Sequence, residues 1–392
     1  MTDAFVWPPQ VDDARLTEAM RWFGRARGRS LNEGECQTSW QTVAFTYKPD
    51  LRRVPRPYPE TGTWVASLHS SGTTAEPVFS PWSEVDQAVA DATTQQIHKR
   101  CPSIQGARCA VIAPAPPLAA AHFMMREIEL SDGVPFLIEP GEPERTCRAL
   151  IDNGIEVVFT LPLIASRLGE YLNNAAHRRR PVAVSLVFCV GDVLAPARQS
   201  MLTALWEAPV LNMFGCSELF GPVAGPAEAG HPLVWCCEPV AVEVIDPVSM
   251  SHCQVGERGV LVLTTLWPKA SPLQRYWTDD SVEVTQACPV HGCFAFHYIG
   301  RPTSTLQTPC GHVALRTIDE LLLGSGLCGS EWSVRRTAEG ICVEAEMLTR
   351  SPGATREVRD ALVEMIGEPM GFVARKPGSL PRIAPKFRVV TA

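Results

Sequence analysis

No apolar run in this sequence reaches the roughly 18 residues that a membrane-spanning helix needs. The first residues, 1–7, include the acidic Asp3 and lack both a basic flank and an apolar core, so we expect no signal peptide. Internal repeats and low-complexity segments are missing as well. These absences argue against a membrane, secreted or repeat protein and predict a globular protein of the cytoplasm.

Positive charge is scarce, since 35 lysines and arginines stand against 42 aspartates and glutamates, for a net charge of −7. Nucleic-acid binding needs a basic surface, and the sequence has no basic stripe, so nucleic acid is not an expected partner. The 14 cysteines are scattered, and many lie in apolar runs such as 186–189. That distribution is typical of reduced, buried thiols in a cytoplasm.

The length of 392 residues exceeds what one ordinary core holds, which predicts a large and a small domain. We place the large domain at residues 1–300 and the small one at 301–392. Between residues 80 and 214, strand-like apolar segments alternate with amphipathic helical segments. The expected helices are 83–100, 118–130, 144–153, 164–176 and 195–207, and the expected strands are 107–113, 134–138, 155–161, 183–190 and 210–214.

This alternation predicts an α/β fold in which parallel strands are flanked by helices on both faces. After residue 240 the pattern changes, because the strand-like runs 240–245 and 259–265 have no long helix between them. We therefore expect a small antiparallel or β-barrel-like section there. The last ninety or so residues predict a small α+β domain. Its expected helices are 317–323 and 354–366, and its expected strands are 331–337, 341–348 and 371–376.

Small hydroxyl residues surround a glycine directly after the strand-like run 64–68. Backbone N–H groups and hydroxyls in such a loop can hold phosphate oxygens, because a glycine lets the backbone approach a polyanion closely. The lysine and the glycine spacing of a Walker A loop are missing. By composition alone the cluster also fits a polar surface turn. Its residues are Ser70, Ser71, Gly72, Thr73 and Thr74.

Five segments resemble, in the same order along the chain, the motifs of the adenylate-forming superfamily. That superfamily contains acyl-CoA synthetases, luciferases and the adenylation domains of peptide synthetases. The matching segments are SSGTTxxP at 70–77, FGCSE at 214–218, RYWTDD at 275–280, Gly300-Arg301 and GSLPRIAPK at 378–386. Gly191-Asp192 also matches a Gly-Glu pair near the adenine of the bound nucleotide.

The resemblance implies a role for each matching residue. Glu218 would hold Mg²⁺, since a hard cation prefers oxygen ligands, and Asp280 would accept hydrogen bonds from both ribose hydroxyls. Lys386 would offset the charge that grows on the α-phosphate. The implied catalytic residues are Lys386, Glu218 and Thr73, and the implied nucleotide-binding residues are Ser70, Ser71, Gly72, Thr73, Thr74, Gly191, Asp192, Phe214, Gly215, Ser217, Asp280 and Arg301.

The segments 243–247 and 256–266 resemble the phenylacetate–CoA ligase group within this superfamily. That group often carries a structural zinc site beside the corresponding strand pair. The matching soft ligands are His231, Cys237, Cys288 and Cys293, which would suit tetrahedral Zn²⁺. A patch of buried free thiols is an equally good interpretation of these cysteines. The group also implies a small aromatic acid as substrate and a homodimer.

The sequence departs from the superfamily motifs in three functional segments, which are the phosphate loop, the hinge and the element that serves thiolation. Ala75-Glu76 replaces Gly-Lys in the phosphate loop, which brings a negative charge toward the phosphates. The acidic hinge after Arg301 is replaced by 302–304, where Pro302 restricts the backbone. The element that serves thiolation reads Pro309-Cys310-Gly311-His312. Adenylation is therefore expected to survive, whereas the step with CoA is open to change or replacement.

The implied reaction joins a small acid to AMP, releases pyrophosphate and passes the acyl group to CoA, an amine or a carrier protein. The acid pocket is expected between the sheet and the segment 214–222, including Leu219 and Phe220. Two alternatives remain. One is the ATP-dependent activation of nitrite to diazotise an aromatic amine in a natural-product pathway. The other is an inactive relative that serves as a binding or scaffold protein.

Overall fold

The computed structural model divides into two compact units that are each discontinuous in sequence. Unit 1 contains Met1–Gly106, Ala115–Gly133 and Met213–Tyr298, and unit 2 contains the rest. Because unit 2 joins residues from both sides of residue 300, the domain boundary at that position stays a prediction. The structure describes residues 6–7, 13–26, 43–51, 64–69, 79–113, 119–174, 182–226, 232–267, 269–288, 293–309, 311–337, 340–349, 351–367, 369–382 and 389–391.

Unit 1 is built on a sheet whose strands come mainly from the part of the chain after residue 210. In spatial order the strands are β1 (Val6–Trp7), β11 (Val240–Ile245), β12 (Arg258–Thr265), β13 (Tyr276–Cys288), β14 (Cys293–Gly300), β10 (Leu233–Trp235), β9 (Gly221–Pro226) and β8 (Val210–Cys216). β11, β12 and β13 pair antiparallel, as predicted. β10 pairs with β14 on one side and with β9 on the other, which makes these strands continuous with the rest of the sheet.

The helices of unit 1 are α1 (Asp13–Ala26), α2 (Lys48–Leu51), α3 (Glu84–His98) and α4 (Ala119–Leu130). A hairpin of β2 (Trp64–His69) and β3 (Phe79–Ser83) leads into α3. Helix α3 begins with a capping box, in which Ser83 Oγ accepts from the Asp86 N–H and an Asp86 oxygen accepts from the Ser83 N–H. This arrangement satisfies two backbone donors at the helix start and buries the Asp86 carboxylate.

Unit 2 contains the predicted parallel sheet, in the order β7 (Leu186–Val190), β6 (Val157–Thr160), β4 (Arg108–Ile112) and β5 (Val134–Ile138). All four residues of β6 are buried, as expected for a central strand that is covered on both faces. Its helices are α5 (Pro143–Asp152), α6 (Pro162–Asn173) and α7 (Pro196–Trp206). Each begins with a proline, whose fixed φ suits a first helical position that needs no N–H donor.

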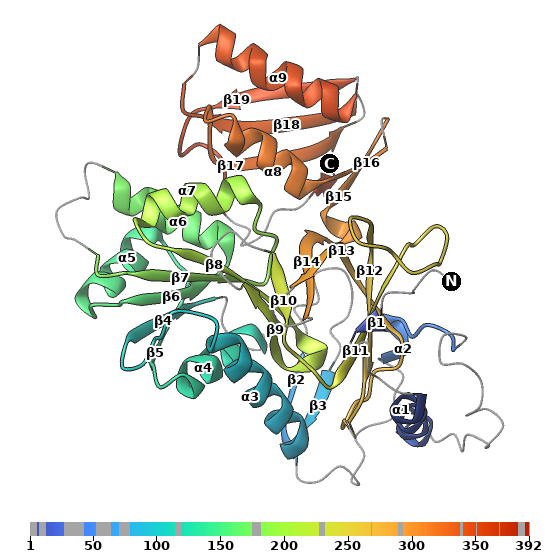
Figure 1. Ribbon diagram of the computed structural model, residues 1–392. Coiled ribbons are helices and arrows are strands. Elements are labelled where there is room, and N and C mark those ends of the chain that lie inside the picture. The colour runs from blue at the N-terminus through green and yellow to red at the C-terminus, as the bar shows by residue number, and fades with distance from the viewer. Residues whose placement is uncertain are drawn as a thin grey trace. The chain divides into compact units, whose positions relative to one another are not determined.

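The C-terminal part of unit 2, orange to red in Figure 1, forms the predicted small α+β domain. A sheet of β19 (Met370–Arg375), β18 (Gly340–Met347), β17 (Cys328–Thr337) and β20 (Val389–Thr391) shares one apolar core with α8 (Leu315–Gly324) and α9 (Pro352–Ile366). The short helix η5 (Pro302–Ser304) and the hairpin of β15 (Thr305–Thr308) and β16 (Gly311–Ala314) precede it. The α/β class predicted from the sequence is therefore confirmed.

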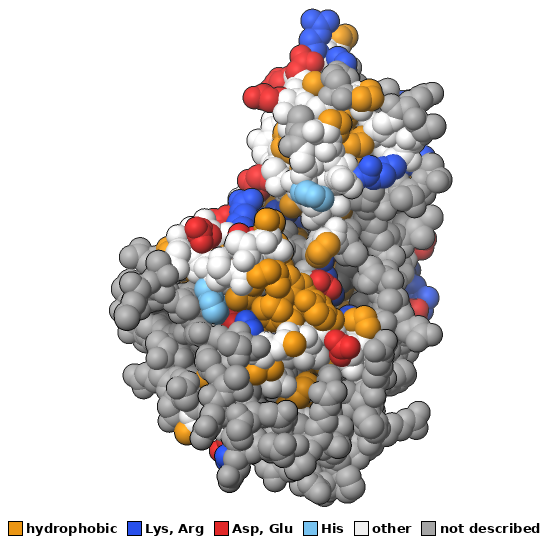
Figure 2. Space-filling model, turned by 90° about the vertical axis from the view of Figure 1, so that its right-hand side faces the viewer, with side chains coloured by type: hydrophobic (Ala, Val, Ile, Leu, Met, Phe, Trp, Pro, Cys, Tyr) orange, Lys and Arg blue, Asp and Glu red, His pale blue; other side chains and the backbone are white. Residues whose placement is uncertain are grey.

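Every helix within the described part of the chain is too short or too polar to span a bilayer. Acidic and basic side chains are interspersed on the face shown in Figure 2, where the described lysines and arginines do not gather into one stripe. This distribution agrees with the negative net charge of the sequence.

Candidate functional site: two buried carboxylates in unit 1

Glu218 lies in the short helix η4 (Ser217–Leu219), which directly follows the buried strand β8. The side chain is only 4% exposed, although a glutamate normally remains in water. Tyr276 Oη donates to Glu218 Oε1 at 3.1 Å, and the Cys216 thiol donates to Oε2 at 3.2 Å. A buried carboxylate with only one such donor on each oxygen keeps lone pairs for a further ligand.

Asp280 is equally well buried, on strand β13, with 2% exposure. Its Oδ1 accepts from Tyr298 Oη at 2.9 Å, and its backbone N–H donates to Thr278 Oγ1 at 3.0 Å. The ring of Phe214 lies 5.1 Å from the ring of Tyr298, between centroids. Phe214 and Asp280, which the sequence assigned to nucleotide binding from separate motifs, therefore meet through one tyrosine.

The Cys216 thiol connects the two carboxylates electrostatically. Burial, followed by the negative charges of Glu218 and Asp280, raises the pKa of this thiol well above its ordinary value. The same causes raise the pKa of the Tyr276 hydroxyl. Both groups therefore stay protonated near neutral pH, where they act as donors to Glu218.

These features fit the magnesium role that the sequence implies for Glu218. A carboxylate oxygen is the kind of ligand that Mg²⁺ takes, and the nearest described cation, Lys48 Nζ, is 3.9 Å from Oε1. That separation exceeds a hydrogen bond, so Lys48 does not occupy the oxygen in the way a tight ion pair would. Gly215, also assigned to the nucleotide, lies where β9 passes close by, since a Cβ there would sit 3.0 Å from Gly221 O.

Ser217, another implied nucleotide residue, begins η4 in unit 1, whereas Gly191, Asp192 and Arg301 lie in unit 2. Gly191 adopts a φ of +84° in the loop after β7, and Asp192 Oδ1 accepts from the Val193 N–H at 2.8 Å. A Cβ on Gly300 would lie 3.3 Å from Val193 Cγ2, so the Gly300-Arg301 motif runs beside this loop. Two motifs that the sequence separates by more than a hundred residues are thus adjacent in space.

Several predicted residues lie outside the described residues, namely Ser70, Ser71, Gly72, Thr73, Thr74, His231 and Lys386. The side chains of Cys288 and Cys293, at the facing ends of β13 and β14, are also outside the description. Cys237 is buried, and burial raises the pKa of its thiol to about 12. The described side chains contain no group of three metal ligands, and the zinc site stays a prediction.

An anchored C-terminal segment in unit 2

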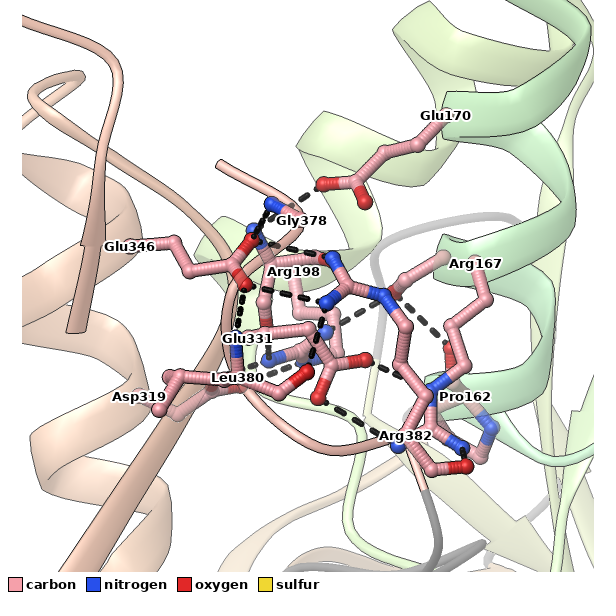
Figure 3. A network of polar contacts seen from close by, with 12 residues as sticks. Pro162, Arg167, Glu170, Arg198, Asp319, Glu331, Glu346, Gly378, Leu380 and Arg382 are labelled. Atoms are coloured by element: carbon pink, nitrogen blue, oxygen red, sulfur yellow. Dashed lines mark hydrogen bonds and ion pairs between the residues drawn. The ribbon is translucent and has the colours of Figure 1, made fainter. Parts of the chain in front are cut away.

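Arg198 of α7 is fully buried and lies at the centre of a polar network that includes residues of the C-terminal part (Figure 3). Its guanidinium donates to both carboxylate oxygens of Asp319, at 2.8 and 2.6 Å. It also donates to Ser166 Oγ on α6 and to the backbone oxygen of Ser330 on β17. One arginine therefore connects helices α6 and α7 with α8 and β17.

A second arginine, Arg167 on α6, lies beside this network. It donates to the Glu331 carboxylate at 2.5 and 3.3 Å and to the backbone oxygen of Arg382 at 3.2 Å. The segment that leads to Lys386 thus contacts α6 directly. Figure 3 shows the two arginines pointing toward the carboxylates of the C-terminal part from neighbouring helices.

Glu346 fixes the backbone of the same segment. Its carboxylate accepts from the Gly378 and Leu380 N–H groups, each at 2.8 Å, and from Arg382 at 2.9 Å on both oxygens. Burial opposes ionisation of Glu346, but the hydrogen bonds from Arg382, Leu380 and Gly378 outweigh it and lower the pKa. The carboxylate therefore anchors residues 378–382, which precede Lys386 in the sequence.

Glu346→Gln is expected to reduce the free energy of unfolding by about 2 kcal/mol near neutral pH, because it removes charge-assisted hydrogen bonds. The folded-state pKa lies below the ordinary 4.5, so this contribution is fully present above 4.5. It is lost as the pH falls through the folded-state pKa. Urea unfolding of both proteins from pH 7 down to about pH 2 measures the difference and covers the range below 4.5 in which it should disappear.

The matched control is Glu364→Gln, which changes an exposed glutamate on α9 and is expected to leave stability unchanged at every pH. A pH-independent difference between Glu346→Gln and the wild type would contradict the ionic role of Glu346.

The sequence motifs identify the two buried carboxylates of unit 1, Glu218 and Asp280, but not the side chains that donate hydrogen bonds to them. Tyr276 lies inside the motif 275–280, which gives it no role of its own, and Tyr298 lies in none of the motifs. Glu346 and Arg198 carry no local pattern that distinguishes them from solvated charges, because their partners lie far away in sequence. A polar residue inside an apolar strand pattern, as Glu346 is in 341–347, was the one available signal.

No family model matches the chain. In sequence it is 27% identical over 270 residues to a phenylacetate-coenzyme A ligase of Thermus thermophilus. The match covers 63% of this chain and 57% of that relative, so it spans just over half the relative's length. This similarity confirms the resemblance to phenylacetate–CoA ligases that the motifs suggested.

Solved structures with the same fold include a 2-hydroxyisobutyryl-CoA ligase in complex with an acyl-AMP. Its TM-score is 0.82 at 16% identity, and the match covers 97% of this chain and 88% of that one. An anthranilate CoA ligase in complex with anthranoyl-AMP matches with a TM-score of 0.58 at 14% identity, over 81% of this chain and 65% of that one. The chain therefore has the fold of CoA ligases.

Proposed function

We propose that the protein is an ATP-dependent, adenylate-forming ligase. It activates a small acid, for which an aromatic acid is the first choice, to an acyl-AMP and then transfers the acyl group to CoA. Two similarities support this assignment. The chain resembles a protein named phenylacetate-coenzyme A ligase in sequence, and it shares the fold of a 2-hydroxyisobutyryl-CoA ligase. An amine or a carrier protein is the alternative acceptor, given the altered residues 309–312.

The observation that carries the proposal is the pair of buried carboxylates in unit 1. Glu218 and Asp280 come from two separate motifs, and both are buried and accept from a tyrosine hydroxyl. A buried acid such as Glu218, whose nearest described cation lies 3.9 Å away and beyond hydrogen-bond distance, is expensive to maintain for stability alone. Glu218 and Asp280 are the groups that the adenylation of an acid requires for the metal and for the ribose.

In the proposed first step, an oxygen of the acid attacks the α-phosphorus of ATP in line. A new O–P bond forms, the bond to the β-phosphate oxygen breaks, and pyrophosphate leaves. Asp280 accepts from the ribose hydroxyls, Gly191, Asp192 and Arg301 contact the nucleotide, and Ser70 to Thr74 hold the phosphates. Lys386 offsets the charge on the α-phosphate, and positioning with electrostatics provides the catalysis.

Magnesium, bound at Glu218, would neutralise phosphate charge in this step. In the second step the nucleophile attacks the acyl carbon, and AMP leaves with the electron pair of the broken C–O bond. Zinc at His231, Cys237, Cys288 and Cys293 would be structural and take no part in either step. A homodimer in the cytoplasm remains part of the proposal.

Lys386→Ala tests the assignment with AMP and pyrophosphate release as the readout. The wild type, supplied with ATP, Mg²⁺ and a panel of aryl and short acids, should release AMP only when its acid is present. Lys386→Ala should lower that rate about 100-fold or more, because a cation at the developing charge is lost. The exposed Lys376 lies in the same part of the chain, and Lys376→Ala is the control that should keep wild-type activity.

Coenzyme A and an aromatic amine are then added separately to identify the acceptor. Stimulation by CoA supports the ligase, whereas acid-dependent AMP release that only an amine stimulates assigns the alternative acceptor. If the well-folded wild type binds ATP but turns over no acid, and Lys386→Ala behaves in the same way, the result contradicts the enzyme assignment and favours a scaffold protein.

A further inference from the structure

Lys269 is buried in unit 1 with 2% exposure, and its Nζ finds no hydrogen-bond acceptor among the described residues. An ammonium group has three donors, and a buried one without an acceptor is among the most unfavourable arrangements in a protein interior. The loop that carries Lys269 is nevertheless held on both sides of the lysine by hydrogen bonds to Asp86. The three donors of Lys269 therefore call for an anion that the described part of the chain does not provide.

The surroundings of Lys269 place it at the predicted acid pocket. Its Nζ lies 4.1 Å from the centroid of the Phe220 ring, on the ring face, where a cation is attracted to the π electrons. Phe220 follows the helix that carries Glu218, and its φ of +65° is a conformation that bulky residues rarely adopt. Such a conformation persists where the surrounding structure demands it, often at a ligand site.

A second buried donor in the same cluster has no hydrogen-bond partner within the part of the chain that the structure describes. Trp82 stacks on the same Phe220 ring that faces Lys269, with the ring centroids 5.0 Å apart and the ring planes within 2° of parallel. The Trp82 Nε1 donor also has no acceptor among the described residues. Trp82, Ala90, Phe123 and Phe220 form one buried group. Two unsatisfied donors against one phenylalanine ring favour a ligand that accepts hydrogen bonds over an apolar one.

The loop that carries Lys269 is held by Asp86 at the start of α3. Asp86 accepts from Trp267 Nε1 at 2.8 Å and from the Ala270 N–H at 3.2 Å, on either side of Lys269. Oδ2 of the carboxylate also accepts from the Ser83 N–H and Oγ. Asp86 therefore holds the loop on both sides of the lysine, while Nζ itself makes no hydrogen bond to it.

Burial lowers the pKa of Lys269 to about 8, and the charges of Asp86, Cys216 and Glu218 oppose that change. An anion at Nζ would restore full protonation. Because Glu218 is among the charges that act on Lys269, the lysine and the proposed metal ligand belong to one region of unit 1.

We propose that Lys269 is the residue that binds the negatively charged oxygen of the substrate acid, and that this acid is a compact oxyanion, either a small carboxylate or nitrite. The inference rests on the proposed function, since it names the substrate class of the same site. It differs from a structural role, in which Lys269 only balances the buried charges of Asp86 and Glu218.

Binding without ATP tests the inference independently of catalysis. Isothermal titration of the wild type is carried out with benzoate, acetate and nitrite, and with the neutral amides benzamide and acetamide. At least one anion is expected to bind, and a bound carboxylate should bind about 30-fold or more tightly than its amide, because the amide leaves the buried charge unpaired. Nitrite as the only bound anion assigns the inorganic source. Absence of binding by all three anions, or equal binding of acid and amide, overturns the proposal.

Lys269→Met keeps the length of the side chain and removes its charge. It is expected to weaken binding of the anion about 30-fold or more and to raise the KM for the acid, while the KM for ATP stays within about twofold. Lys99→Met, at an exposed lysine of the same unit, is the control that should match the wild type.

An unchanged anion affinity in a folded Lys269→Met protein overturns the assignment and leaves the lysine a structural counter-charge. Wild-type protein that binds the anion but releases no AMP would refute the proposed ligase activity and leave the binding site standing. The two failures are therefore distinguishable.

Discussion

Glu218→Gln should lower the rate of acid-dependent AMP release on the order of 100-fold or more, because it removes the charge proposed to hold Mg²⁺. Glutamine has the same shape and can still accept from Tyr276 Oη, which donates to Glu218 Oε1 at 3.1 Å. The fold should therefore be preserved. Steady-state AMP release, measured over a range of Mg²⁺ concentrations, should show a higher half-saturating concentration for the variant.

Two comparisons separate this effect from a loss of structure. Glu238→Gln alters an exposed glutamate of the same unit and should keep wild-type activity and magnesium dependence. Tyr276→Phe keeps the carboxylate but removes one donor, so a smaller loss is expected. A Glu218→Gln protein with activity within threefold of the wild type and the same magnesium requirement would contradict the metal role.

Asp319→Ala should reduce the free energy of unfolding by about 3–5 kcal/mol, because it leaves Arg198 buried without its carboxylate. Arg198 is fully buried and donates to Asp319 through two nitrogens, and Trp332 Nε1 also donates to Asp319 at 2.7 Å. Urea unfolding at 25 °C, followed by circular dichroism, measures the loss. Limited proteolysis should also cut the C-terminal part faster, since Arg198 connects α6 and α7 with α8 and β17.

The contrast with an exposed pair makes the test specific. Glu144 and Arg148 form an ion pair between two exposed side chains, one helical turn apart on α5. Glu144→Ala removes this pair and should change the free energy of unfolding by no more than about 0.5 kcal/mol. Replacing both Arg198 and Asp319 by apolar residues of similar size should recover much of the loss. A change below 1 kcal/mol in Asp319→Ala would show that the network contributes little.

The elements were predictable because their signals are local. The helices α3 and α4 and the strands β4, β6 and β7 follow from apolar periodicity, proline positions and capping residues within a few positions of each end. The pairing of β10 with both β9 and β14 was not predictable, because a strand of three residues carries no register information.

The sequence by itself determined the order of the motifs and the chemistry that each side chain can perform. It assigned Glu218, Asp280 and Lys386 roles through their neighbours in the chain, because a motif is a short-range pattern. The tertiary structure alone decided which carboxylate meets which hydroxyl, and it brought Tyr276 to Glu218 and Tyr298 to Asp280. It also decided that Lys269 is buried against Phe220 with no acceptor among the described residues, since burial and pairing depend on contacts between distant segments.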